Sequence, residues 1–173
     1  MASILKVSRL GHPVLRTKVA EVSRDLLATP TIQTFIDNMI ETMYEYIGVG
    51  LAAPQVHESL SIAVIESRSP RGDIPLTVLV NPVVTVMDES LVEDWEGCLS
   101  IPELRGRVPR FRKLRVDAMD RTGKQIQFVA EDFFARVVQH EVDHLMGHVY
   151  LDRMRDFATL SHLLEFQRYW LPQ

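Results

Sequence analysis

The segment Gln139–Leu145, Gln-His-Glu-Val-Asp-His-Leu, combines the residue types best suited to chemistry. In a helix, His140 and His144 lie one turn apart on the same face, with about 5–6 Å between Cβ atoms, so both imidazoles can bind one metal ion. Glu141 follows the first histidine and can reach water at that ion without binding the ion itself. The spacing predicts a chelating pair with Glu141 as general base; the simpler alternative is a helix with two surface histidines.

Catalytic metal centres usually have three protein ligands, so this pair needs a third. His148, His162 and Glu165 are in range by sequence, but His148 follows the glycine that ends the helix and the other two belong to a segment expected to pack in the core. Cys98, in the segment Glu96–Ser100, lies between polar residues and offers a thiolate, which suits a borderline-soft divalent ion. Alone, a single cysteine is as well explained as a small buried apolar residue. The presence of the histidine pair favours Cys98 as the ligand.

A third segment, Gly48–Gln55, reads Gly-Val-Gly-Leu-Ala-Ala-Pro-Gln. It lacks the Gly-Lys-Ser/Thr ending of a phosphate loop and follows a predicted helix rather than a strand, which excludes nucleotide binding of that kind. Its glycines and alanines allow another backbone to approach closely, as an extended peptide does when it pairs with a strand edge. Gln55 could then donate an amide N–H to a developing oxyanion. Taken alone, the segment is better explained as a glycine-ended helix followed by a tightly packed loop.

Helices must position these residues. Apolar residues at helical spacing predict a helix over 30–47, in which Thr29 is the N-cap, Pro30 is the first residue and Gly48 takes the left-handed conformation at the end. A second helix is expected over 132–146, with Asp132 as its cap and Gly147 as its stop, and a third over 156–169. The apolar residues of the third helix are expected to share one side; they are Phe157, Leu160, Leu163, Leu164 and Trp170.

Short β-branched runs between the first two helices predict strands. They cover 61–65, 77–80, 83–87, 114–119 and 126–129, with turns at 71–73, 81–82 and 121–123. A helix followed by strands and then by helices indicates the α+β class rather than parallel βαβ units. We therefore expect antiparallel strands packed around a central H-E-x-x-H helix, with an N-terminal amphipathic helix and a C-terminal helix.

Composition narrows the function class further. The 173 residues fit one domain, expected to span 1–173, and 46% hydrophobic with 24% charged residues is a globular balance. A net charge of −4 argues against general attraction to nucleic acid or anionic lipid. No apolar run is long enough to span a bilayer, the N-terminus lacks the features of a secretory signal, and the single cysteine allows no internal disulfide. A cytoplasmic location is the expectation.

Together, the three segments resemble those of peptide deformylase, in which the motifs G-φ-G-φ-A-A-x-Q, E-G-C-φ-S and H-E-φ-D-H occur in this order (φ, apolar). Here they stand at 48–55, 96–100 and 140–144, and the resemblance runs from about residue 5 to 155. Further matching residues are Gly11–Arg16, Ile101–Pro102, Val108–Arg110, Leu145, Gly147, Asp152 and Arg153. One motif alone is moderate evidence, whereas three in order are hard to obtain by chance.

The resemblance implies a metallohydrolase that removes the formyl group from formyl-methionyl peptides and releases formate. The implied metal ligands are Cys98, His140 and His144, with Glu141 as the acid/base and with oxyanion contacts from the Gln55 side chain and the Leu99 N–H. The usual ion is Fe²⁺, often exchanged for Zn²⁺, Ni²⁺ or Co²⁺. An ion pair between Glu96 and Arg105 is also implied. The residues expected to contact the substrate are Val49, Gly50, Glu96 and Arg105.

Two positions depart from the family pattern. Asp132 replaces a glycine found in one subgroup, which we interpret as a capping change. Arg136 lies one turn before His140, where other members carry an aliphatic residue near the pocket for the methionine side chain. We expect Arg136 to alter the shape of that pocket but not the reaction.

Two rival functions remain at the level of sequence. One is a zinc peptidase that cuts internal peptide bonds, against which the Cys98 ligand and the short chain argue. The other is a non-catalytic protein with a structural metal or with a surface for ribosomal RNA. The surface for RNA would be a cluster of basic residues in this chain: Arg105, Arg107, Arg110, Arg112, Lys113 and Arg115. A solvated face is the favoured interpretation of this cluster, because Phe111 is its only aromatic residue. We expect a monomer that binds neither DNA nor membranes.

Overall fold

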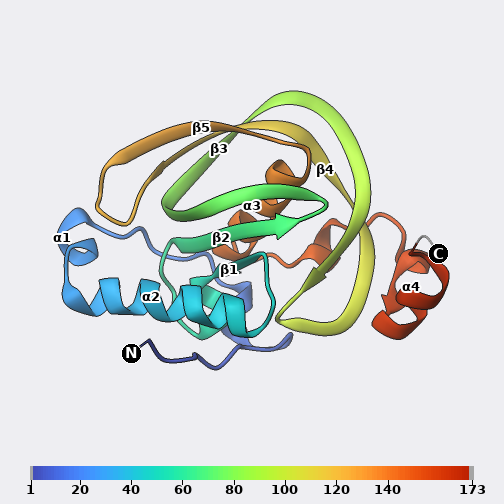
Figure 1. Ribbon diagram of the computed structural model, residues 1–173, viewed down its shortest axis with the longest axis horizontal. Helices are drawn as coiled ribbons and strands as arrows, with labels where there is room; N and C mark the ends of the chain where they lie inside the picture. Colours follow the sequence, from blue (N-terminus) through green and yellow to red (C-terminus); the bar gives the residue numbers. More distant parts are fainter. Residues whose placement is uncertain (1, 172–173) are drawn as a thin grey trace.

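An antiparallel sheet forms the body of the protein in a computed structural model that describes residues 2–171 (Figure 1). Its strand order is β1-β2-β3-β4-β5, and β6 pairs with β4. The strands are β1 Gly50–Ala52, β2 Ile62–Ser69, β3 Gly72–Cys98, β4 Ile101–Met119, β5 Gln125–Glu131 and β6 Ser161–His162. The helices are α1 Arg24–Leu27, α2 Pro30–Glu45, α3 Asp132–Leu145 and α4 Leu163–Tyr169, with 3₁₀ turns at Pro13–Arg16, Ala53–Val56, Tyr150–Arg153 and Phe157–Thr159. The α+β expectation is confirmed.

The predicted first helix is confirmed as α2, but its end differs. The Thr29 hydroxyl accepts the N–H of Ile32, as expected for an N-cap. The left-handed residue after the helix is Ile47, with φ of 54°, and not Gly48. Gly48 instead leaves room for Leu99, because a Cβ there would lie 3.0 Å from Cδ1 of Leu99, a tight contact. A glycine that follows a helix therefore need not be the residue with the left-handed conformation.

The expected turn at Asn81-Pro82 is wrong, and the two strands predicted around it are one strand, β3. Its pairing with β4 shifts between Val80 and Val83, which marks a bulge. Asn81 adopts a φ of 52°, and its side-chain amide bonds both the N–H and the carbonyl of Val22 at 2.9 Å. These two bonds to Val22 hold Asn81 where the regular pairing of β3 with β4 is interrupted, and β3 continues beyond it. The hairpin turn expected at 121–123 is confirmed, whereas the one expected at 71–73 lies at 70–71, because Gly72 already pairs with Ser69.

The distal halves of β3 and β4, residues 88–98 and 101–113, were not predicted as strands. Charged residues dominate these segments, which hides the alternation that identifies a half-buried strand. The two strands join through the two-residue turn Leu99–Ser100, flanked by the pair Cys98 and Ile101. This hairpin places Cys98 at the end of β3.

The H-E-x-x-H segment lies in α3, as predicted. Gly147 ends the helix with a φ of 80°. Asp132, however, is not the cap: it has a φ of 49°, and its carboxylate pairs with Arg112 at 2.8 Å. The left-handed backbone at this position accounts for the glycine of the related subgroup.

The predicted helix over 156–169 is wrong in its first half. Asp156 caps a 3₁₀ turn by accepting the N–H of Ala158, and β6 then pairs with β4 before α4 begins at Leu163. The proposed apolar side does not face the core either, since Phe157 and Leu164 are 61% and 65% exposed. The periodicity of this segment was therefore misleading.

Two apolar clusters hold the helices against the sheet. The first packs α2 on β1, β2 and β3, and its buried members include Ile36, Met39, Met43, Leu51, Ile62 and Val64. The second packs α3 on β2 to β5, and its buried members include Leu79, Leu114, Val116, Ala135 and Val138. In Figure 1, α3 lies within the curve of β3, β4 and β5. Among residues 2–171, no helix has the length and apolarity needed to cross a membrane.

The basic cluster is largely neutralised by neighbouring acids. The exposed ion pairs are Arg107–Glu93, Arg112–Asp132, Lys113–Glu131 and Arg115–Asp117. Arg110 points inward and is buried. A surface whose cations are already paired offers little net positive potential to phosphates, which supports the solvated-face interpretation.

Candidate metal and active site

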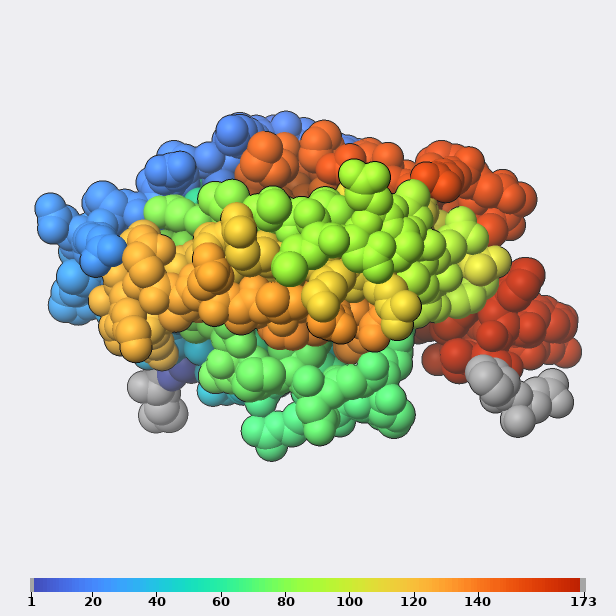
Figure 2. Space-filling view, turned by 90° about the horizontal axis from the view of Figure 1, so that it is seen from above, coloured from blue at the N-terminus to red at the C-terminus, as the bar shows by residue number. Residues whose placement is uncertain are grey.

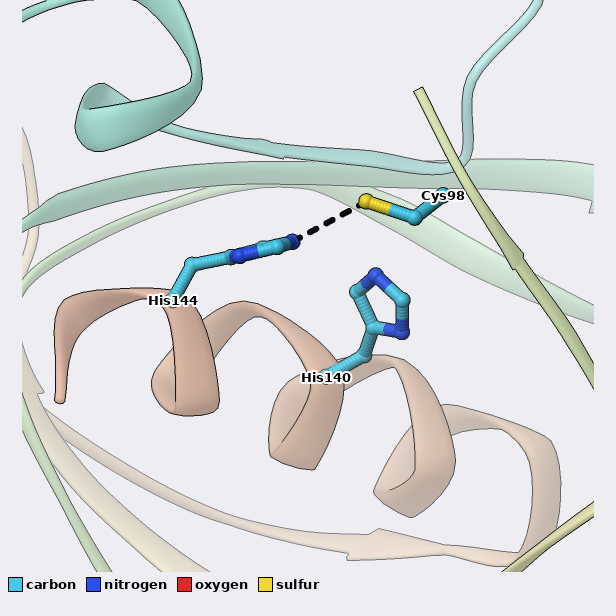
Figure 3. A group of neighbouring side chains, drawn as sticks. All are labelled: Cys98, His140 and His144. Carbon is cyan, nitrogen blue, oxygen red and sulfur yellow. Dashed lines mark hydrogen bonds between the residues drawn. The ribbon is translucent and has the colours of Figure 1, made fainter. Parts of the chain in front are cut away.

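Cys98 from β3 and the two histidines from α3 converge on one point (Figure 3). One ligand atom from each lies within 4.8 Å of the others, and Cys98 Sγ lies 3.3 Å from His144 Nε2. Both imidazoles rise from the same side of the helix toward the thiol. The structure thus brings together the three ligands expected from sequence. The alternative ligands lie elsewhere, because His148 faces Asp152 and His162 faces Glu103.

The chemistry of this cluster suits a divalent transition metal. Burial alone would raise the pKa of Cys98, but the imidazoles of His144 and His140 hold that pKa well below its usual value. Burial likewise would lower the pKa of His140, while its contacts with Cys98 and Glu96 hold it well above the usual value. A buried thiolate is stable only beside positive charge, which a bound divalent cation would supply. Nδ1 of His144 is buried and has no hydrogen-bond partner among residues 2–171. One sulfur and two nitrogen donors fit a borderline-soft ion.

Glu96 orients the first histidine. Its Oε2 lies 2.9 Å from His140 Nδ1, which leaves the other ring nitrogen free for an ion. Arg110 bonds both carboxylate oxygens, at 2.9 and 3.0 Å, and Arg136 bonds Oε1 at 2.7 Å. Burial would raise the pKa of Glu96, but the bonds to His140 and Arg110 hold it well below the usual range. The carboxylate is therefore ionised.

The expected ion pair between Glu96 and Arg105 is wrong. Successive residues of a strand face opposite sides, and Arg105 lies on the side of Gly97. A Cβ on Gly97 would lie 2.7 Å from Nε of Arg105, so the Arg105 guanidinium packs directly on the backbone of Gly97. Arg110 and Arg136 hold Glu96 in its place.

Sequence reasoning also missed Asp143. Its carboxylate bonds Arg110 and Arg153, each at 2.6 Å, and is largely buried. Arg110 thus joins Glu96 on β3 to Asp143 on α3 and fixes the two ligand-bearing elements relative to each other. The available signal was an acidic residue inside the H-E-x-x-H motif that neither binds metal nor acts as the base.

Replacing Arg110 with methionine should lower the free energy of unfolding by about 3 kcal/mol, because two buried carboxylates lose a shared partner. Arg136 and Arg153 remain as their other partners and limit the loss. Urea denaturation measures the change. The control is Arg112→Met, which breaks an exposed pair and should change stability by less than about 1 kcal/mol. Equal effects of the two substitutions would refute the role assigned to Arg110.

Glu141 occupies the position expected of a general base. Its side chain is buried, faces the same cleft as Cys98 and His140, and has an Oε2 without a hydrogen-bond partner in the described chain. Burial raises the pKa of Glu141 to about 7, against the opposing effect of the imidazoles of His140 and His144. A carboxyl group with such a pKa both accepts and releases a proton near neutral pH.

Gly50 on β1 leaves the space that the Glu141 side chain fills. A Cβ at this position would lie 2.7 Å from Cδ of Glu141, and a buried carboxyl group has little room to yield. We expect Gly50→Ala to displace the carboxylate and to lower kcat by about 100-fold while metal content stays near wild type. Unchanged kcat in Gly50→Ala would show that the carboxylate need not be held here.

Gln55 and Leu99, the two residues predicted to donate to an oxyanion, lie close to Cys98. The side-chain Oε1 of Gln55 accepts the N–H of Ala52 at 2.8 Å. This bond turns the side-chain –NH₂ toward Cys98 Sγ and Ser100 Oγ, both at 3.4 Å. Leu99 follows the thiol in the tight turn, and Arg9 donates to its carbonyl oxygen. Both predicted donors therefore lie beside the three-ligand cluster.

A cleft runs past these groups. Its lining includes all four residues expected to contact the substrate: Val49, Gly50, Glu96 and Arg105. β1 forms one wall and is an edge strand, paired only with β2 among the described strands. An extended peptide can therefore add to its free edge. The opposite wall is the end of β3.

Arg136 lines the cleft from α3 but is held by the protein. Besides Glu96, its guanidinium bonds the carbonyls of Val108 at 2.8 Å and of Val92 at 2.6 Å. Nearby, Arg71 lies 4.4 Å above the ring of Phe133 and pairs with Asp94. This part of the cleft is thus built from an aromatic ring and engaged charges.

Comparison with known sequences identifies close relatives. Residues 4–159 match the family model described as polypeptide deformylase. The chain is 42% identical over 161 residues to peptide deformylase 1 of Bordetella pertussis, with 90% of each chain covered. It is 43% identical over 164 residues to peptide deformylase 1 of Nitrosomonas europaea, with 92% of each covered.

Solved structures share the fold. The class I type b peptide deformylase of Acinetobacter baumannii with Met-Ala-Ser bound has a TM-score of 0.85 and 36% identity, and the match covers 89% of this chain and 100% of that chain. A peptide deformylase of Synechococcus elongatus in complex with actinonin has a TM-score of 0.83 and 33% identity, covering 99% of this chain and 90% of that chain. The similarity extends over most of the sequence and most of the fold.

Proposed function

Because this chain belongs to the polypeptide deformylase family, we propose that it hydrolyses the N-formyl group of formyl-methionyl peptides. The products are formate and a peptide with a free amino terminus. The observation that carries the proposal is the buried, unpartnered carboxylate of Glu141 beside the Cys98, His140 and His144 cluster. A structural metal site has no use for such a group, whereas hydrolysis requires one.

Cys98, His140 and His144 would hold one divalent ion, with Fe²⁺ as the native ion and Zn²⁺, Ni²⁺ or Co²⁺ as substitutes. When bound, the ion supplies a Lewis acid that acidifies water and polarises the formyl carbonyl. Glu96 keeps the His140 ring in the orientation that such binding needs, through the 2.9 Å bond to Nδ1.

The remaining steps belong to residues of the chain. Glu141 takes a proton from the attacking water and later gives it to the leaving amine, a role that its buried carboxyl group, with an Oε2 unpartnered in the described chain, supports. The Gln55 –NH₂ and the Leu99 N–H donate to the oxyanion that forms on the formyl oxygen. Val49 and Gly50 bind the peptide backbone along β1, while Glu96 and Arg105 contact it from the other wall.

The peptide substrate is supported by the Acinetobacter baumannii relative, which was solved with Met-Ala-Ser bound. We further propose that the chain acts in the cytoplasm as a monomer, with the activity contained in one domain over 1–173. The basic cluster is the surface through which the chain would contact ribosomal RNA. The ion pairs within that cluster argue against such a contact.

Metal replacement tests the proposal. The protein is stripped of metal, reloaded anaerobically with Fe²⁺, Ni²⁺ or Zn²⁺, and assayed for formate release from a formyl-Met peptide during hours in air. Only reloaded protein should release formate, and the Fe²⁺ form should lose activity faster than the Ni²⁺ form, because Fe²⁺ is oxidised in air. Equal decay would trace the loss to the Cys98 sulfur or to unfolding instead. Formate release by stripped protein would contradict the proposal.

A further inference from the structure

The C-terminal helix closes one end of the cleft. Phe166 of α4 and Leu171 just beyond it line the cleft together with Trp95 of β3. The Trp95 ring lies 4.8 Å from the ring of Phe166 and 5.4 Å from that of Trp170, both tilted. Figures 1 and 2 show α4 in red, standing out from the body at one end of the molecule. The apolar end of the cleft is thus built from two segments far apart in sequence.

The helical part of this wall lies beyond the family match. The family match ends at residue 159, before α4 begins at Leu163. A helix of seven residues is not stable by itself in water, so its contacts must hold it in place. Those contacts are the pairing of β6 with β4 and the packing on Trp95. Leu164 and Tyr169, in contrast, are each 65% exposed.

The aromatic wall lies at a defined distance from the reacting centre. Trp95 precedes the thiol of Cys98 by three residues on β3, which corresponds to roughly 10 Å along a strand. An extended peptide rises by about 3.3 Å per residue, as a strand does, so about three of its residues cover this distance. A side chain two or three residues into the substrate therefore reaches Trp95, whereas the first side chain lies near Glu141.

We propose that Trp95, Phe166 and Leu171 form a subsite for an apolar or aromatic side chain at the second or third residue of the substrate peptide. The inference rests on the proposed deformylation, because that reaction sets which end of the peptide lies at the metal cluster. The subsite is continuous with the cleft, and two of its three members are aromatic rings that can pack on an incoming ring. It gives the enzyme a preference among formyl peptides.

Kinetics test the preference. The ratio of kcat/KM is measured for formyl-Met-Ala-Phe over formyl-Met-Ala-Ala, and for formyl-Met-Phe-Ala over the same reference, with Ni²⁺-loaded protein. In the wild type, one of these two ratios of kcat/KM should be about 10. The difference between the peptides should lie mainly in KM. Phe166→Ala should bring this ratio close to one, and Phe166→Leu should retain most of it. The control Leu164→Ala, on the exposed side of the same helix, should leave the ratio unchanged.

Fluorescence gives a readout that does not depend on turnover. The chain has two tryptophans, and both, Trp95 and Trp170, belong to this aromatic wall. Titrating the unformylated peptides Met-Ala-Phe, Met-Phe-Ala and Met-Ala-Ala into Ni²⁺-loaded protein should shift the emission, with about tenfold tighter binding for one of the phenylalanine peptides. Phe166→Ala should abolish that difference, and its circular dichroism shows whether it is folded.

The outcomes separate the two proposals. Failure to release formate from any formyl peptide would reject the proposed function, while the titration would still report on the subsite. Ratios near one in the wild type, equal binding of the three peptides, or equal losses in Phe166→Ala and Leu164→Ala would overturn the subsite. Selective loss in Phe166→Ala with rescue by Phe166→Leu would support it.

Discussion

Replacing Glu141 with glutamine is expected to lower kcat by about 10²–10⁴-fold while metal content stays near wild type. Glutamine nearly preserves the shape of the side chain and can still bond the attacking water, but it cannot accept the proton. Glu141 provides no donor to the three-ligand cluster, so binding of the ion should not depend on its charge state. Elemental analysis and formate release on the same preparation check both parts.

The matched control for this substitution is Glu93→Gln, which alters a partly exposed carboxylate that pairs with Arg107. It should leave kcat within about twofold of wild type, since surface ion pairs contribute little. Wild-type activity in Glu141→Gln with full metal content would remove Glu141 from the mechanism. Loss of metal in that variant would instead show that the carboxylate supports the ion.

Replacing Cys98 with serine should lower the affinity for the metal ion by more than about 10-fold. Removing a residue that only hydrogen-bonds to a ligand already costs about 10-fold, and Cys98 is itself a predicted ligand. A hydroxyl is a much poorer donor than a thiolate to a divalent transition metal. The imidazoles of His140 and His144 favour the thiolate at this position, and serine provides no equivalent anion. Metal retained after challenge with a graded series of chelator concentrations measures the difference.

His148→Asn is the control for the ligand assignment, because His148 lies outside the cluster and faces Asp152. It should retain the ion as the wild type does. Unchanged retention in Cys98→Ser would return Cys98 to the role of a buried apolar residue and reopen the choice of the third ligand.

The metal cluster was predictable because its signal is local. His140 and His144 are related by one helical turn, so their proximity follows from the helix alone. Cys98 lies on another element, and its choice depended on the chemistry of a thiolate and on the family motifs. The contacts that orient the ligands were not predictable, because Glu96 meets Arg110 and Arg136 across the sheet–helix boundary rather than the expected Arg105.

The errors in secondary structure have the same origin. Asn81 bonds Val22, a partner distant in sequence, so a dipeptide typical of a turn became a bulge inside β3. The apolar residues of 156–169 suggested one helix, but β6 pairs with β4 and Phe166 packs on Trp95 of β3. In each case a tertiary contact overrode a local pattern.

The most direct test of the central claim is mass spectrometry of a formyl-Met peptide after incubation with anaerobically metal-loaded protein. A deformylase gives one product, the full-length peptide without its formyl group, together with an equal amount of formate. A peptidase would instead give internal fragments. Internal fragments, or an unreacted peptide in the presence of bound metal, would contradict the account.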